Sequence, residues 1–221
     1  ENRVRFTTMF GNLVVRFTDY VTRKPFYSFI GNRSVNETAK QLLRLAKQEG
    51  LEPVLKLIPE ETVGGLDNQL FRIQEDPDNF DYILSAEKMQ SLEGSHFQTQ
   101  RKKLHKFLRT HQTQTMILDI SEPSVQKKLQ ALFLKWEEWK QLPRAQTENE
   151  MKAVLRLHDT QTTNGLITIG VFVGDELLGF TISEIQRDGY GMLHFEKALP
   201  LGFTGISQYL KQETARILSS H

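Results

Sequence analysis

The sequence contains no cysteine, which excludes disulfides, thiolate metal sites and a cysteine nucleophile. It has no run approaching the ~18 consecutive apolar residues of a membrane-spanning helix and no leader typical of a signal peptide. Charge of one sign is not in excess, because 28 Lys and Arg face 27 Asp and Glu. A protein that coats nucleic acid over its whole surface is therefore not expected. The balanced net charge does not exclude a local patch of basic residues.

Several catalytic and metal-binding motifs are also missing. The His, Asp and Glu residues do not follow zinc or EF-hand spacing, and the chain has neither a Walker loop nor a Gly-x-Ser-x-Gly elbow. What is present is 14 Phe, 5 Tyr and 2 Trp in 221 residues, enough to bury a core in one large domain or two compact ones. Because the chain begins at Glu1 rather than Met, we expect a processed or partial product, with any membrane anchor elsewhere.

Hydrophobic patterning in the first third predicts strands at residues 13–17 and 26–30, followed by a helix that ends at Gly50. A capping box at residues 34–37 is expected to open that helix. The apolar residues 54–58 are typical of a buried strand, and Pro59 is expected to start a short helix. This order favours an α/β fold, and the acidic residues 74–79 favour a domain boundary.

The rest of the chain predicts strands at residues 80–84 and 116–120, a Ser85 cap, and a long helix opened by Pro123. A second capping box, residues 147–150, is expected to open a helix that carries His158 as a satisfied buried histidine. A strand meander over residues 167–198, a loop and a last helix follow. This order is typical of an acyltransferase of the GNAT type.

The densest charge lies in residues 98–111, where an apolar helical stripe leaves the cations on the exposed face. Five cations without an acid repel one another, which favours a patch for phosphate groups over an ordinary solvated helix face. The candidate anion-binding residues are Arg101, Lys102, Lys103 and Lys106.

A second cluster of ionisable residues lies in the predicted strand before the last helix. Alternation is expected to place His194 and Glu196 on one face of that strand and Lys197 on the other. Either His194 or Glu196 could act as general base, and Lys197 could stabilise developing negative charge. The alternative is a salt-bridged strand end. Glu184, which closes the neighbouring strand, could hold a substrate ammonium group or could be plain surface.

The same segments carry a resemblance to a known family. The matching segments are Phe80-Asp-Tyr-Ile-Leu-Ser85, Leu92-Glu-Gly94, Arg101, Lys106-Phe107, Phe180-Thr-Ile-Ser-Glu184, His194-Phe-Glu-Lys-Ala198, and Gly205-Ile-Ser-Gln208 with Glu213. Together they resemble the phosphatidylglycerol lysyltransferase C-terminal domain, along nearly the whole chain. The segment at residues 194–198 with its downstream helix is the most specific part.

The resemblance implies tandem GNAT-like halves with mixed sheets flanked by helices. Residues 1–79 would form a first half that lacks its start, and residues 80–221 a second half that lacks its closing strands. It further implies that a lipid hydroxyl attacks the ester of an aminoacyl-tRNA, in the cytoplasm at the inner membrane face. Glu184 and residues 194–197 would line a tunnel between the halves, and Gln208 and Glu213 would contact substrate.

The sequence departs from the family pattern at several positions. The family usually has Lys-Arg-Asn at residues 100–102, Gly at Ser183 and Asn at Lys211. Residues 200–205 also do not match the pyrophosphate-binding loop of GNAT enzymes that use acetyl-CoA. We therefore expect no tightly bound cofactor and no metal, with aminoacyl-tRNA favoured as donor over acyl-CoA.

Three functions follow as hypotheses. The first is an aminoacyl or acyl transferase acting on a hydroxyl or amine acceptor, such as an anionic phospholipid. The second is a catalytically silent module that binds RNA or anionic membrane through the basic helix. The third is a CoA-dependent N-acyltransferase.

Overall fold

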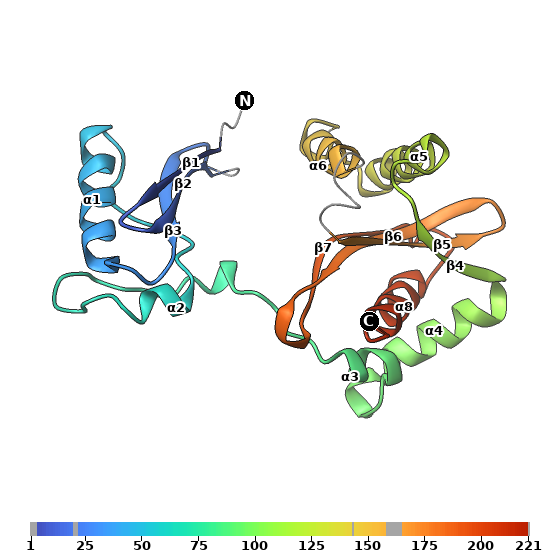
Figure 1. The fold of residues 1–221 in the computed structure, drawn as a ribbon. Helices are drawn as coiled ribbons and strands as arrows, with labels where there is room; N and C mark the ends of the chain where they lie inside the picture. Colours follow the sequence, from blue (N-terminus) through green and yellow to red (C-terminus); the bar gives the residue numbers. More distant parts are fainter. Residues whose placement is uncertain (1–3, 20–21, 143, 158–164, 221) are drawn as a thin grey trace. The chain divides into compact units, whose positions relative to one another are not determined.

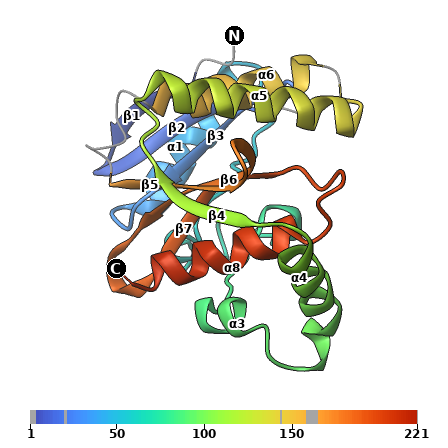
Figure 2. The same ribbon diagram turned by 90° about the vertical axis from the view of Figure 1, so that its right-hand side faces the viewer.

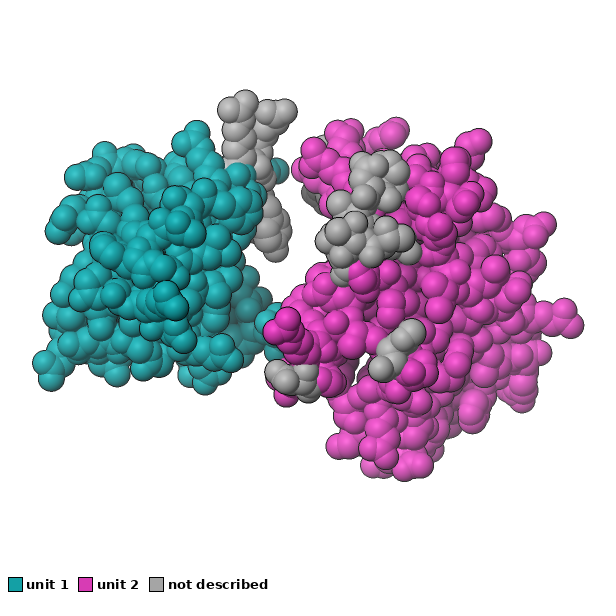
Figure 3. Space-filling view, in the orientation of Figure 1, with its two compact units in different colours: residues 1–82 teal, residues 83–221 magenta. Residues whose placement is uncertain are grey.

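A computed structural model describes residues 4–19, 22–142, 144–157 and 165–220. Contacts divide the chain between Tyr82 and Ile83 into two compact units, residues 1–82 and 83–221, which Figure 3 colours separately. The α/β class is confirmed, with two antiparallel sheets flanked by helices. That either unit is a GNAT-like half stays a prediction.

The first unit is a three-stranded antiparallel sheet covered by one long helix (Figure 1). Its elements are β1 (Arg5–Met9), β2 (Asn12–Thr18), β3 (Pro25–Ile30), α1 (Val35–Gln48), α2 (Glu60–Val63) and the 3₁₀ turn η1 (Pro77–Asn79). The apolar stripe of α1 explains the packing, because Ala39 and Leu42 are buried against Val14 and Phe29 of the sheet. Strand β1 was not predicted from the sequence.

The second unit is a four-stranded antiparallel sheet in the order β4-β5-β6-β7. Its strands are β4 (Thr113–Leu118), β5 (Leu166–Val173), β6 (Glu176–Ile185) and β7 (Gly191–Ala198). Its helices are α3 (Ala86–Ser91), α4 (Gln98–Thr110), α5 (Pro123–Lys140), α6 (Arg144–Arg156) and α8 (Ile206–Leu218), with 3₁₀ turns η2 (Ser95–Phe97) and η4 (Arg187–Gly189).

Helices cover both faces of this second sheet (Figure 2). Helices α5 and α6 lie on one face, where Phe133 packs against Phe180 with ring centroids 5.8 Å apart. Helices α4 and α8 lie on the other, where Phe107 and Leu210 bury Val171. A sheet buried on both faces needs apolar residues along its whole length, and β5 and β6 supply them. No helix among the described residues is both long and apolar enough to cross a bilayer.

Several local predictions are confirmed. Pro123 stands in the first turn of α5, and the Ser85 side chain caps α3 by accepting a hydrogen bond from the Lys88 backbone N–H. The meander at residues 167–198 corresponds to β5, β6 and β7. His158 lies outside the described residues.

Both predicted capping boxes are wrong. Ser34 has a left-handed backbone and its side chain makes no cap; its carbonyl oxygen accepts hydrogen bonds from Thr38 instead. Thr147 lies inside α6, which begins at Arg144, and its hydroxyl donates to the buried carboxylate of Glu137. At Thr147 a tertiary partner takes the hydroxyl that the local pattern assigns to a cap, whereas at Ser34 the left-handed backbone departs from the extended conformation that a side-chain cap requires.

Two predicted strands are also wrong. Residues 54–58 hold a single bridge, from Leu55 to Tyr27, and prolines at positions 53 and 59 limit any longer ladder. Residues 80–84 have no regular structure, and Tyr82 is 91% exposed. An apolar β-prone run becomes a strand only where another strand pairs with it, which a local pattern does not specify.

Candidate functional site

The ionisable residues of β7 are distributed by a β-bulge. Ile182 of β6 pairs with Phe195 of β7, but Ser183 pairs with Leu193, so His194 is an extra residue in the ladder. Side-chain alternation therefore breaks at His194. The predicted sharing of one face by His194 and Glu196 is wrong for this reason.

The contacts of these side chains show the resulting arrangement. His194 contacts Glu184, which lies two residues from Ile182 and hence on the face that α5 covers. Lys197 reaches Glu150 of α6 on that same face. Glu196 instead faces α8, where it meets Lys211. The structure thus brings Glu184 and His194 together and separates Glu196 from Lys197.

Lys197 is the most enclosed of these groups. The residue is 7% exposed, and its ammonium nitrogen donates to both carboxylate oxygens of Glu150 at 2.7 and 2.8 Å. The same nitrogen lies 4.0 Å from the centroid of the Trp136 ring and 5.6 Å from that of Phe133. Pairing and cation–π contact together compensate for loss of hydration. Its role as an electrostatic stabiliser stays a prediction.

Glu196 is the half-buried carboxyl group of the other face. Burial raises the pKa of Glu196 above its ordinary value of 4.5, and the nearby Lys211 ammonium, 3.7 Å away, offsets part of that rise. Burial therefore favours the protonated form of Glu196 relative to an exposed glutamate. Its role as a general acid or base stays a prediction.

His194 and Glu184 form a pair at the open end of the two strands. The imidazole Nε2 lies 3.4 Å from a Glu184 oxygen, and the two side chains are 32% and 29% exposed. The Gln186 amide donates to the same carboxylate oxygen at 3.1 Å and so holds it in place. A carboxylate beside Nε2 favours the imidazole tautomer that carries its proton on that nitrogen, with Nδ1 as the acceptor.

The two predicted substrate-binding residues of α8, Gln208 and Glu213, lie in different surroundings. Glu213 is engaged by Arg216, whose guanidinium donates to it at 2.8 and 3.2 Å, and Gln208 is half-buried one turn earlier. The residue before α8 is Gly205, whose φ of 109° and close approach to α4 require glycine. A Cβ atom there would lie 2.3 Å from the carbonyl oxygen of Lys103.

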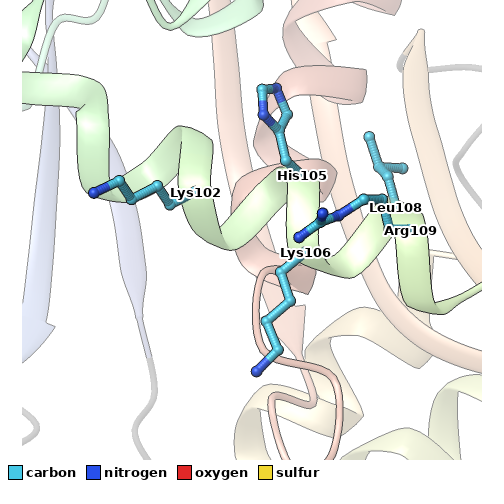
Figure 4. A pocket seen from close by; sticks show the side chains of 5 residues that line it. All are labelled: Lys102, His105, Lys106, Leu108 and Arg109. Carbon is cyan, nitrogen blue, oxygen red and sulfur yellow. The ribbon is translucent and has the colours of Figure 1, made fainter.

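Helix α4 presents the predicted basic face. Leu104 and Phe107 are buried beneath it, and the exposed cations are Lys102, Lys103, Lys106 and Arg109. Figure 4 shows that three of these side chains, with His105 and Leu108, line a hollow of about 560 Å³. Arg101 differs from the others, because its guanidinium donates to the carbonyl oxygens of Leu92 and Gly94 and so secures the loop before α4.

Two residues of the site were not predicted as functional. Glu150 was assigned to a capping box and Lys211 was noted only as a departure from the family pattern. Glu150 lies 47 positions before its partner Lys197, so nothing in the local sequence pairs them. Among the described residues, no three His, Asp or Glu side chains are grouped to hold a metal ion.

Comparison with known proteins identifies the family. A family model described as the phosphatidylglycerol lysyltransferase C-terminal domain matches residues 11–221. The chain belongs to this family. Among curated proteins, none matches the sequence.

Two solved structures share the fold of this phosphatidylglycerol lysyltransferase C-terminal family member. A conserved protein of unknown function from Bacteroides thetaiotaomicron is 19% identical, with a TM-score of 0.75, over 98% of this chain and 73% of the other. The C-terminal domain of a protein assigned as a lysylphosphatidylglycerol synthetase from Agrobacterium fabrum is 12% identical, with a TM-score of 0.63. This match covers 99% of this chain and 67% of the other.

The Lys197–Glu150 pair yields a stability prediction. Glu150→Ala should lower the free energy of unfolding by about 3 kcal/mol, because it leaves the enclosed Lys197 ammonium without its carboxylate. The matched control on the same helix is Glu148→Ala, which breaks an exposed, solvent-screened pair with Lys152 and should lower the free energy of unfolding far less. Denaturant unfolding measures both, and equal losses would contradict the structural role of the buried pair.

The raised pKa of Glu196 yields a pH prediction. In the unfolded chain Glu196 ionises near 4.5, whereas the folded state favours the protonated form, so this group's contribution to stability is lost as pH rises from 4.5 through the folded pKa. Glu196→Gln stays neutral, and its stability relative to the parent should therefore increase between about pH 4 and pH 7. The free energy of unfolding, measured across that range, checks the sign.

Glu148→Gln is the control with the opposite sign. Lys152 lowers the pKa of Glu148, so the parent gains stability from this group as pH rises through that lowered pKa to about 4.5, and the variant should become less stable relative to the parent over that lower range. Parallel profiles for the two variants would show that burial does not govern the titration of Glu196.

Proposed function

We propose that this chain transfers an aminoacyl group from an activated ester to a hydroxyl or amine acceptor, in the manner of a GNAT-type transferase. Family membership over residues 11–221 supports the reaction class. The observation that carries the proposal is the His194–Glu184 pair, a partly exposed imidazole oriented by a carboxylate at the ends of β6 and β7.

The proposal gives each member of the pair a role. With its proton on Nε2 facing Glu184, His194 accepts the proton of the acceptor group at Nδ1 while that group attacks the ester carbonyl. The bond from the carbonyl carbon to the leaving oxygen then breaks, and the imidazolium returns its proton to that oxygen. Because the ester is already activated, most of the catalysis comes from positioning and from stabilising the oxyanion.

Aminoacyl-tRNA fits the proposal better than acyl-CoA as the donor. The start of α8, where a pyrophosphate would meet a helix N-terminus, lies directly against the backbone of α4 at Lys103. The exposed cations of α4 offer a separate surface for the phosphates of a polynucleotide. A phospholipid such as phosphatidylglycerol is the acceptor that the family name suggests.

His194→Ala tests the transferase proposal. Turnover of lysyl- or alanyl-tRNA onto phosphatidylglycerol vesicles should fall by about 100-fold or more, because the general base is removed. Glu184→Gln should retain the imidazole but lose part of its orientation, and so fall between the parent and His194→Ala. The exposed His96→Ala is the matched control and should leave the rate unchanged. A full rate in His194→Ala would refute the assignment of the base.

A specific observation favours a second candidate function. Among the residues that the structure describes, none of Lys102, Lys103, Lys106 and Arg109 forms a salt bridge, although all four are exposed on one helix. Unpaired cations on a folded surface are suited to polyanions. The chain would then be a binding module for RNA without catalytic activity.

Salt dependence and a charge reversal test this surface. Lys102→Glu and Lys106→Glu should each weaken RNA binding and reduce the slope of log affinity against log salt by about one. The control is Lys127→Glu, an equal charge change at an exposed position of α5. RNA binding measured between about 50 and 200 mM salt gives the slopes. Identical slopes for all three variants would remove α4 from the interface, and binding without turnover would favour the silent module.

A further inference from the structure

Strand β4 is one of the two outermost strands of the second unit's sheet, and it crosses the front of that sheet in Figure 2. It pairs with β5 on one side, from Thr113 opposite Val173 to Ile117 opposite Ile169. Among the residues that the structure describes, no strand lies on its other side. The backbone N–H and C=O groups of residues 113–117 that point away from β5 therefore form a row that another strand could pair with.

Strand β4 lacks the features that usually protect such an edge. It reads Thr-Gln-Thr-Met-Ile-Leu, without a charged residue or a proline. Its register with β5 is unbroken, so no bulge twists the edge away. Met116 and Ile117 point to opposite faces of the sheet and are 43% and 59% exposed. A regular, uncharged edge with exposed apolar side chains is the kind that accepts a further strand.

The opposite edge of the same sheet is protected. Strand β7 carries the bulge at His194 and, close to it, the charged residues Glu196 and Lys197. Bulges and charged side chains both oppose pairing with another chain. The sheet therefore has one open edge rather than two. Two copies that join through this edge leave no second open edge, so the assembly closes at a dimer instead of growing into a filament.

The charges on either side of β4 are arranged for pairing with an identical, antiparallel strand. The exposed Arg109 precedes β4, and the exposed Asp119 and Glu122 follow it. In an antiparallel pair of identical strands, the start of each strand lies opposite the end of the other. The basic end of one copy would then meet the acidic end of its partner, at both ends of the pair. A parallel arrangement would instead bring like charges together, which is unfavourable.

We propose that this chain forms a homodimer in which β4 pairs with β4 of a second copy and joins the two four-stranded sheets into one of eight strands. The inference goes beyond the proposed reaction and does not depend on it. Backbone hydrogen bonds along residues 113–117 supply the specific attraction. Met116 and Ile117 lose their exposure to water at the junction, which adds a hydrophobic contribution.

Measurement of the oligomeric state, by sedimentation of the full chain, tests the proposal. Between about 1 and 100 μM the mass should rise from monomer to dimer, without larger species. Ile117→Lys places a charge at the shared edge of both copies and should raise the dissociation constant at least about tenfold. Met116→Lys is a second variant in case the first fails to fold. The matched control is Leu193→Lys, an equal change at a 46% exposed position of the other outermost strand, which should leave dimerisation unchanged.

Cross-linking identifies the strand that pairs. The chain has no cysteine, so a single introduced cysteine is the only thiol that a bifunctional maleimide can modify. Gln114→Cys should be linked into dimers by a spacer of about 10 Å, because paired strands lie about 5 Å apart. Leu193→Cys on β7 should remain monomeric after the same treatment. A parent that stays monomeric throughout, full dimerisation of both folded lysine variants of β4, preferential linking of Leu193→Cys, or growth into larger assemblies would each overturn the inference.

Discussion

One extra residue in an edge strand decides what the candidate site can do. Without the bulge at His194, alternation along β7 would place that imidazole beside Glu196 and over α8. With it, the imidazole meets Glu184, and the sheet separates this pair from the half-buried carboxyl group of Glu196. Two acid–base groups in unlike environments can hold different protonation states at one pH, which a single mixed cluster could not do.

The pairing of charges is the second constraint on the site. Burying Lys197 without Glu150 would leave an ammonium ion enclosed by aromatic rings and cut off from water, so α6 has to lie where its carboxylate meets β7. The fold and the electrostatics of the site are therefore linked through α6.

The sequence predicts this fold well where periodicity is local. The helix that begins at Pro123 and the β5–β7 meander depend on residues that are neighbours in sequence, and the exposed face of α4 follows from its apolar stripe. The partner of Lys197 lies 47 positions away, and the bulge at His194 leaves no trace in the hydrophobic pattern. Which ionisable side chains meet is set by tertiary packing, so residue types could be predicted but their pairs could not.

One close backbone contact links the basic face of α4 to the start of α8. Helix α4 displays unpaired cations, and the close approach at Gly205 fixes α4 against the start of α8, which carries Lys211 two turns later. A polyanionic donor would be attracted by such a surface, whose position relative to α8 is set by the close approach of the Gly205 and Lys103 backbones.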